Sequence, residues 1–390
     1  MKLLNNIDFT IAIAPNATSI EQDLLYIKSA LLYADSITLI SPMASTFFQL
    51  TNEADRKNDR TLYSLIDKVL PFCISSDPIA CANMQPVLEQ LGQVLYSKQW
   101  KSIPTTLKMQ TSKALKTFGC EISEALIKLL GETNCNELID LVKKEKVRLY
   151  NFQNQFSNSP DDYVHEFFDI LTRSVSNTQT FPLFDNQSNN LIKSAINENI
   201  ITLNDSNVFN AQQAGLTNAL LVALPSFEYA TTSEILDIRK ELDTALIRFR
   251  GKMLSYNSEI QSLPWDEEFE PECFRLYQKE IAPSVLEIDE LTKDSGFLKN
   301  LGYSVLADDS ALKSAGGLIL SVAAAGAVST FTEIMSSDAA MLTTGGVYAV
   351  GKLANAYKEY RDKQKGITRK DMYFYYRAGK ILSKKHGKRS

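Results

Sequence analysis

The sequence predicts a mainly α, α+β protein with a small βαβ-containing N-terminal part, a helical body, and a C-terminal helical hairpin followed by a basic helix. Three observations lead to this fold class. A strand, a helix and a second strand follow one another within the first 42 residues. Helical apolar spacing then dominates as far as residue 291. The last eighty residues join uncharged, small-residue runs to a basic, tyrosine-rich end.

Length and composition are those of a globular protein. The chain has 390 residues, of which 44% are hydrophobic and 22% charged, enough to bury a sizeable core. Polar connections divide the chain weakly near residue 155 and near residues 205–215. We expect three regions: 1–155 with the βαβ unit, 156–300 as a helical body with a long amphipathic helix pair, and 301–390 with the hairpin and basic tail.

The N-terminal strand shows period-2 alternation. Apolar side chains at Ile7, Phe9, Ile11 and Ile13 alternate with smaller or polar ones, a pattern typical of a strand. Residues 36–41 form the second expected strand. Because only one helix separates the two strands, we expect them to be parallel with a right-handed crossover.

The helix between these strands has its own start signal. Thr18 and Glu21 have capping-box spacing, and the helical apolar positions that follow are Ile20, Leu24, Ile27 and Leu31. The connection before it, APNATS at residues 14–19, lacks the glycines that let a backbone approach a pyrophosphate. We therefore expect a structural βαβ unit and no cofactor.

Further along the chain, residues 85–100, 106–131 and 136–150 have amphipathic helical patterns. Residues 151–160 and 176–188 are predicted to be loops, and residues 200–203 a short strand.

The strongest helix signal starts at Thr231, which forms a capping box with Glu234. Apolar residues then recur at helical spacing as far as Met253. We predict one long helix whose partner is the segment 274–291, kinked or broken at Pro283.

Cysteine and histidine usage argues against a structural zinc site. The five cysteines are scattered without a C-x-x-C pair, and the chain has only two histidines. The first residues lack the features of a secretory signal peptide. We expect reduced thiols and a cytoplasmic location.

One group of side chains resembles a metal-dependent nuclease site. Asp162, His165, Glu166 and Asp169 share one face of a predicted helix, and such a face binds divalent metals and activates water. The alternative is a solvated helix start, where acids are favoured by the helix dipole. We favour this second interpretation and expect no metal site.

The C-terminal segment is strongly basic. Residues 352–390 hold 13 Lys and Arg against three acids, a formal charge of +10, whereas residues 1–351 carry −15. Cations would neutralise phosphates and tyrosines would stack on unpaired bases. The candidate polyanion-binding residues are Arg361, Lys363, Lys365, Arg369, Lys370, Tyr373, Tyr376, Arg377, Lys380, Lys384 and Lys385. The alternative is that the aromatic residues form the core face of the last helix and the basic end is only solvated.

Residues 314–332 and 339–351 are two uncharged runs of 19 and 13 residues. A transmembrane helix needs about 20 apolar residues, so the second run is too short to cross a bilayer. We expect a hairpin whose small residues allow close helix packing. A membrane-perturbing role is the alternative.

Three stretches resemble a broad group of uncharacterised bacterial proteins: KSALLYADSITLISP at 28–42, LPSFEYATTSEILDIRKELDTALIRFRGKM at 224–253, and DMYFYYRAGKIL at 371–382. The resemblance implies a bacterial or phage-borne cytosolic protein that accompanies mobile elements or phage defence. It implies no catalytic residue.

These observations together favour a non-catalytic interaction or effector subunit whose basic C-terminus binds nucleic acid or an acidic protein. The alternatives are a metal-dependent nuclease centred on Asp162, His165, Glu166 and Asp169, and a membrane-perturbing toxin that uses residues 314–351.

Overall fold

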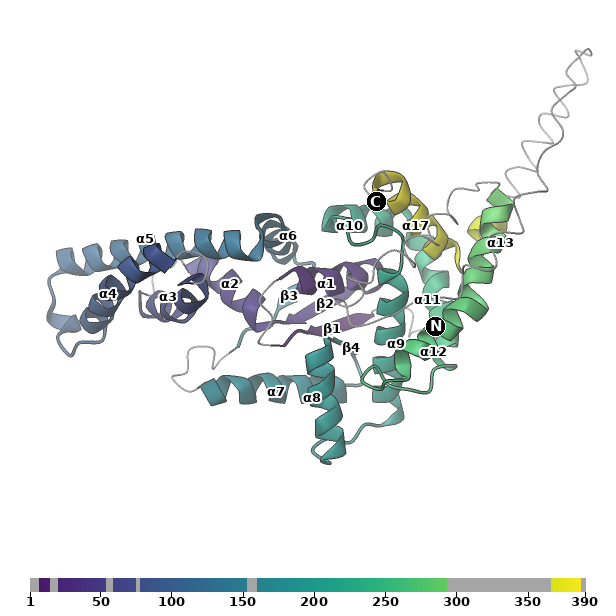
Figure 1. Cartoon of the computed structure of the whole chain (residues 1–390), viewed down its shortest axis with the longest axis horizontal. Helices are drawn as coiled ribbons and strands as arrows, with labels where there is room; N and C mark the ends of the chain where they lie inside the picture. Colours follow the sequence, from purple (N-terminus) through teal and green to yellow (C-terminus); the bar gives the residue numbers. More distant parts are fainter. Residues whose placement is uncertain are drawn as a thin grey trace, which may run out of the picture. The chain divides into compact units, whose positions relative to one another are not determined.

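The computed structural model describes residues 7–14, 20–53, 59–74, 78–152, 160–292 and 366–386 (Figure 1). The chain divides into two units, one of residues 6–211 and one of residues 212–390 with 1–5. The division falls inside helix α9 (Asp205–Val222), within the range 205–215 that the polar connections suggested. The mainly α, α+β fold class is confirmed. The three-region division stays a prediction.

A parallel sheet organises the first unit. Its strands are β1 (Asp8–Ala12), β2 (Ser36–Ile40), β3 (Arg148–Leu149) and β4 (Phe181–Phe184), in the order β3-β2-β1-β4. All three pairings are parallel. The predicted βαβ unit is confirmed, with α1 (Glu21–Tyr33) as its crossover helix. Every residue of β1 from Phe9 to Ala12 is buried, so its alternating sequence does not mark an exposed face.

Helices cover both faces of this sheet. In Figure 1, α1 and α6 (Glu132–Lys143) lie on one face, and α7 (Pro160–Ser176) and α8 (Asn186–Asn197) lie on the other. This placement follows from right-handed crossovers, because the chain moves outward from β1 to β2 but returns from β3 to the opposite side of β1 at β4.

A helical insertion connects β2 to β3. It contains α2 (Pro42–Glu53), α3 (Asp59–Ile74), α4 (Pro78–Leu95), the short 3₁₀ helix η2 (Trp100–Ser102) and α5 (Thr105–Leu130), and it leads into α6. Helix α3 packs against both α4 and α5. Gly131 separates α5 from α6 with a φ of 91°, a conformation that glycine adopts without strain.

Three sequence expectations in this unit were wrong. The helix predicted over 136–150 ends early, because α6 stops at Lys143, the backbone turns at Glu145 with a φ of 54°, and residues 148–149 form β3. The predicted loop at 176–188 contains β4, which pairs with β1 and includes Pro182. Proline is tolerated there because β4 is an edge strand of the described sheet. Residues 200–203 form no strand, since their backbone has no regular secondary structure and Ile200 is exposed. Thr18 lies outside the described residues, and the helix begins at Glu21 without a side-chain cap.

The second unit is helical in its described part. After α9 come α10 (Thr232–Glu241), α11 (Asp243–Asn257), α12 (Phe269–Leu276), the π-helical segment η3 (Tyr277–Ile281), α13 (Ala282–Thr292) and α17 (Tyr373–His386). The capping box of Thr231 and Glu234 is confirmed. Pro283 is the second residue of α13, one residue beyond the π-helical segment, and its missing N–H accounts for the irregularity predicted there.

The predicted long helix at 231–253 is instead two helices. Leu242 ends α10 with φ −106° and ψ 17°, and Asp243 begins α11 as a first-turn acid. The apolar positions on both sides of the break stay buried. The terminal helix α17 packs against both α11 and α13. The predicted pairing of the segment 274–291 with the helices at 231–253 stays a prediction.

Candidate functional site

Three polar side chains gather at the carboxyl edge of the sheet, and their sequence positions alone do not identify them as a group. Asp185 follows β4, Ser41 follows β2, and Asp23 lies in the first turn of α1, the helix that follows β1. Exposed fractions are 4% for Asp185, 1% for Ser41 and 0% for Asp23. In a parallel sheet the carboxyl ends of all strands meet at one edge, which brings these residues together.

Asp185 connects the end of β4 to the end of β1 and to the start of α8. One carboxylate oxygen, Oδ1, accepts the backbone N–H of Ser188 at 2.9 Å and so caps α8. The other, Oδ2, accepts the backbone N–H of Ala14, just beyond β1, at 3.2 Å. Ser41 has a comparable role, since its hydroxyl accepts the N–H of Ala44 in the first turn of α2 at 3.2 Å.

Asp23 differs from both because it caps nothing. Burial raises the pKa of Asp23 to about 7; the Ser41 hydroxyl lowers it and the charge of Asp185 raises it further. Neither carboxylate oxygen has a hydrogen-bond partner of regular geometry among the described residues. A buried carboxyl without partners is costly, and a raised pKa in such a position is typical of functional sites.

The nuclease hypothesis has no geometric support within the described part of the chain. In α7, His165 and Asp169 are exposed and Glu166 is half-buried. Asp169 pairs with Arg173 one turn later at 3.8 Å. No three His, Cys, Asp or Glu side chains of the described residues are arranged to hold a metal. The side chain of Asp162 is not among those described, so the hypothesis stays a prediction.

The terminal helix α17 is held by its aromatic residues. Phe374, Tyr375 and Tyr376 are 0–1% exposed. The ring centroid of Phe249 in α11 lies 5.2 Å from that of Phe374. The hydroxyl of Tyr376 donates to Asp289 Oδ1 of α13 at 3.1 Å. The ring of Tyr376 is therefore inaccessible to a stacked base, which agrees with the alternative that the aromatic residues form the core face of the last helix. Tyr373 is half-buried.

Several cations of the tail pair with acids of the same unit. Lys370 pairs with Glu287, and Arg377 lies 3.5 Å from Glu241. Lys385 and His386 both reach the capping-box carboxylate of Glu234, at 3.4 and 3.0 Å. None of these partners is in the acidic segment 265–272, whose Glu272 instead accepts the backbone N–H groups of residues 261 and 262.

The remaining cations of the tail have different environments. Arg369 and Lys384 are exposed. Lys380 is half-buried, and its ammonium lies 5.7 Å from the centre of the Tyr376 ring. Burial lowers the pKa of Lys380, the charge of Asp289 raises it, and that of Lys384 lowers it. Arg361, Lys363 and Lys365 lie outside the described residues, as do the two uncharged runs within 314–351.

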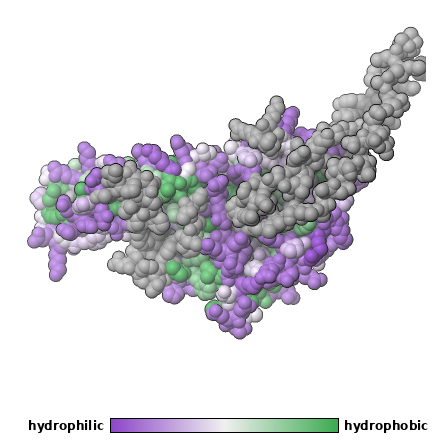
Figure 2. All heavy atoms as spheres, in the orientation of Figure 1, coloured by the Kyte–Doolittle hydropathy of each residue, from purple (hydrophilic) through white to green (hydrophobic). Residues whose placement is uncertain are grey.

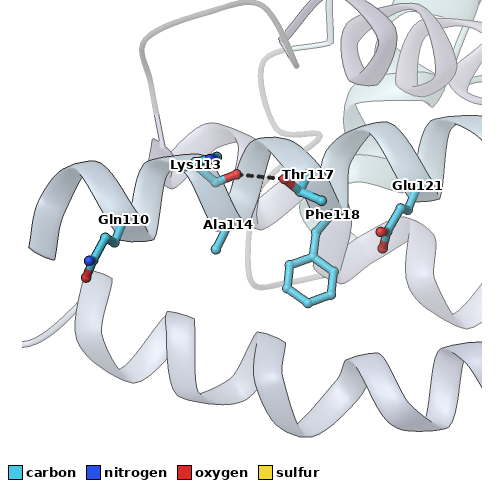
Figure 3. A pocket seen from close by; sticks show the side chains of 6 residues that line it. All are labelled: Gln110, Lys113, Ala114, Thr117, Phe118 and Glu121. Carbon is cyan, nitrogen blue, oxygen red and sulfur yellow. Dashed lines mark hydrogen bonds between the residues drawn. The ribbon is translucent and has the colours of Figure 1, made fainter.

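A hollow lies along one face of α5 (Figure 3). Its lining is Gln110, Lys113, Ala114, Thr117, Phe118 and Glu121, all from this one helix. The Thr117 hydroxyl donates to the Lys113 carbonyl at 3.1 Å within the same helix. The hollow brings no reactive groups together, and we assign it no chemistry.

Figure 2 shows a largely hydrophilic surface with scattered hydrophobic residues.

Comparison with known proteins gives no match to a family model, a curated protein or a solved structure. Within the described residues, no helix has both the length and the apolar character that a membrane crossing requires.

Proposed function

We propose that this protein is a non-catalytic interaction or effector subunit that binds a polyanion through a basic surface at its C-terminus. The basic surface consists of Arg369, Lys384 and Lys385, extended in the sequence by Arg361, Lys363 and Lys365. The observation that carries the proposal is the anchoring of α17 by its aromatic face, with Arg369, Lys384 and Lys385 left exposed. Anchoring lowers the entropic cost of presenting charges to a partner.

The charge distribution supports a polyanion as partner. A segment of +10 on a chain with −15 elsewhere attracts anions locally although the net charge is −5. Ion pairs already occupy Lys370, Arg377 and Lys385. Such exposed pairs are weak, about 0 to 1 kcal/mol each, so Lys385 can exchange Glu234 for a phosphate at small cost.

The proposed cellular setting is the bacterial cytoplasm, in a system of the phage-defence kind. Its support is the resemblance of residues 28–42, 224–253 and 371–382 to bacterial proteins, together with the cysteine chemistry. Cys120, Cys135 and Cys273 are free thiols, which suits a reducing compartment.

The test measures binding of the full chain to fluorescent single- and double-stranded DNA and RNA by anisotropy over a salt series. We expect the logarithm of the association constant to fall linearly with the logarithm of salt concentration. The double variant Arg369→Gln/Lys384→Gln should bind more weakly and reduce the slope by about one for each phosphate that it no longer neutralises. Lys143→Gln/Lys146→Gln changes the net charge equally at exposed positions of the other unit and should bind like the wild type.

Equal weakening by both double variants would show that only net charge matters and would refute the basic surface as the site. Absence of binding to every nucleic acid at low salt would remove nucleic acid as the polyanion and leave an acidic protein for the same surface.

A further inference from the structure

The strand order places a topological switch point between β1 and β4. From β1 the chain adds β2 and β3 on one side, whereas β4 lies on the other side of β1. In open parallel sheets, ligands bind outside the carboxyl ends of the strands where the order reverses in this way. Asp185 lies at this point, hydrogen-bonded to the end of β1 through Ala14.

Asp23 provides an independent observation at the same place. It is fully buried, and neither of its oxygens has a hydrogen-bond partner of regular geometry among the described residues. The Ser41 hydroxyl lowers the pKa of Asp23 as a hydrogen-bonding neighbour and the charge of Asp185 raises it, so both groups lie near its carboxyl. Glu21, two residues earlier in the same helix turn, is exposed, as acids that only complement a helix dipole usually are.

The chemistry of the group indicates its ligand. The oxygen atoms that could bind a ligand here belong to two carboxylates and one hydroxyl. Asp185 is the one charged group among the described residues that shifts the pKa of Asp23. No basic side chain of the described residues shifts the pKa of Asp23 to offset the two carboxyls. A hydroxyl-bearing ligand would donate hydrogen bonds to the carboxylate oxygens but would leave the repulsion between the two carboxylates. A cation would bind the oxygens and also neutralise that repulsion. Hard oxygen ligands favour Mg²⁺ or Ca²⁺ over softer metals.

We propose that Asp23, Asp185 and Ser41 form a binding site for a divalent cation of the Mg²⁺ type at the carboxyl edge of the sheet. The Asp185 oxygens each accept one backbone N–H and keep a second lone pair for the ion. Mg²⁺ commonly binds through one or two carboxylates and completes its octahedron with water or phosphate oxygens. The absence of a third acidic side chain among the described residues is therefore compatible with the site. This proposal is independent of polyanion binding by the C-terminus.

The experiment titrates the full chain with Mn²⁺, followed by electron paramagnetic resonance, and with Mg²⁺, followed by thermal unfolding. We expect one saturable ion per chain and a melting temperature that rises with cation concentration, because an ion that binds the folded state stabilises it. Asp23→Asn should lose both effects. Asp8→Asn is the matched control, since Asp8 lies at the opposite end of β1 and pairs with Arg148 at 3.5 Å; it should retain both.

Absence of saturable Mn²⁺ binding to the wild type at millimolar concentration would overturn the proposal, as would binding that Asp23→Asn leaves unchanged. If Asp23→Asn does not fold, Ser41→Ala becomes the deciding variant. It removes one oxygen ligand and keeps both carboxylates, so a several-fold weaker Mn²⁺ affinity supports the site and an unchanged affinity refutes it.

Discussion

At the scale of single residues, Asp23 carries a signal that is present in the sequence. It lies three residues after Ile20 and four before Ile27, on the same helix face as these buried apolar residues. An acid in the first turn of a helix is favoured by the helix dipole wherever it points, but its place on the buried apolar face makes Asp23 a candidate functional group. The partner residues cannot be found in this way, because Ser41 and Asp185 join Asp23 only through the strand order, and the sequence around β4 predicts a loop.

Glu270 gives a prediction for pH dependence. It is half-buried, and burial alone raises its pKa to about 7 from an ordinary value of 4.5. The folded chain therefore binds this proton more tightly than the unfolded chain, so Glu270 costs stability progressively as the pH rises from about 4.5 to 7. Glu270→Gln should be more stable than the wild type at pH 8, by roughly 1 to 3 kcal/mol, with the difference vanishing at pH 4.

The measurement is chemical denaturation of both chains at several pH values. Glu267→Gln, an exposed neighbour, should show no comparable difference at any pH. A gain for Glu270→Gln that is largest at pH 4 would contradict the assigned direction of the pKa shift.

At the scale of elements, sequence patterns predicted those strands and helices whose formation depends on residues close together in the sequence. The first two strands, helix α1 and the capping box at Thr231 each depend on residues close in sequence. Strands β3 and β4 are only two and four residues long and pair with segments more than 100 residues away. Their stability comes from these distant partners, so no short window of sequence predicts them.

The apolar periodicity of residues 231–253 predicted which residues are buried, but it did not predict where the helix is interrupted. The apolar seam from Ile235 to Met253 is buried as expected, but the helix breaks at Leu242. The backbone N–H of Leu242 still reaches Ile238, and that of Leu246 reaches Leu242. The helical i to i−4 hydrogen bonds are thus present on each side of Leu242, so the side-chain spacing stays helical on both sides and gives no sign of the break.

The anchoring of α17 depends on a buried polar contact that a variant can remove. Tyr376→Phe deletes the hydroxyl that donates to Asp289, which is itself 3% exposed. Losing a hydrogen bond to a buried charged group should cost about 1.5 to 3 kcal/mol. Tyr373→Phe, at a half-buried position of the same helix, should cost clearly less. The measurement is the free energy of unfolding in denaturant; equal effects of the two variants would show that the Asp289 contact does not anchor the helix.

At the scale of the whole molecule, the two proposals fall in different units. The carboxyl edge of the sheet lies within residues 6–211, and α17 lies within residues 212–390. Loss of cation binding in Asp23→Asn and loss of polyanion binding in Arg369→Gln/Lys384→Gln are therefore separate tests. The basic region is recognisable from sequence through its charge, a property visible without structure. The acidic pair at the sheet edge is not, because Asp23 and Asp185 are 162 positions apart.

The uncharged runs at 314–332 and 339–351 lie outside the described residues, and the sequence prediction for them is a packed helical hairpin. The second run, with 13 residues, is too short for a bilayer that needs about 20. Gly326→Leu should then destabilise the chain by roughly 1 to 3 kcal/mol through overpacking, measured by denaturation. Gly251, where an added Cβ would meet no atom within 4 Å, is the control position for a glycine substitution. Flotation of the wild-type chain with liposomes, together with unchanged unfolding of Gly326→Leu, would favour the membrane-perturbing alternative, because lipid tails accommodate an added leucine that a packed helix interface does not.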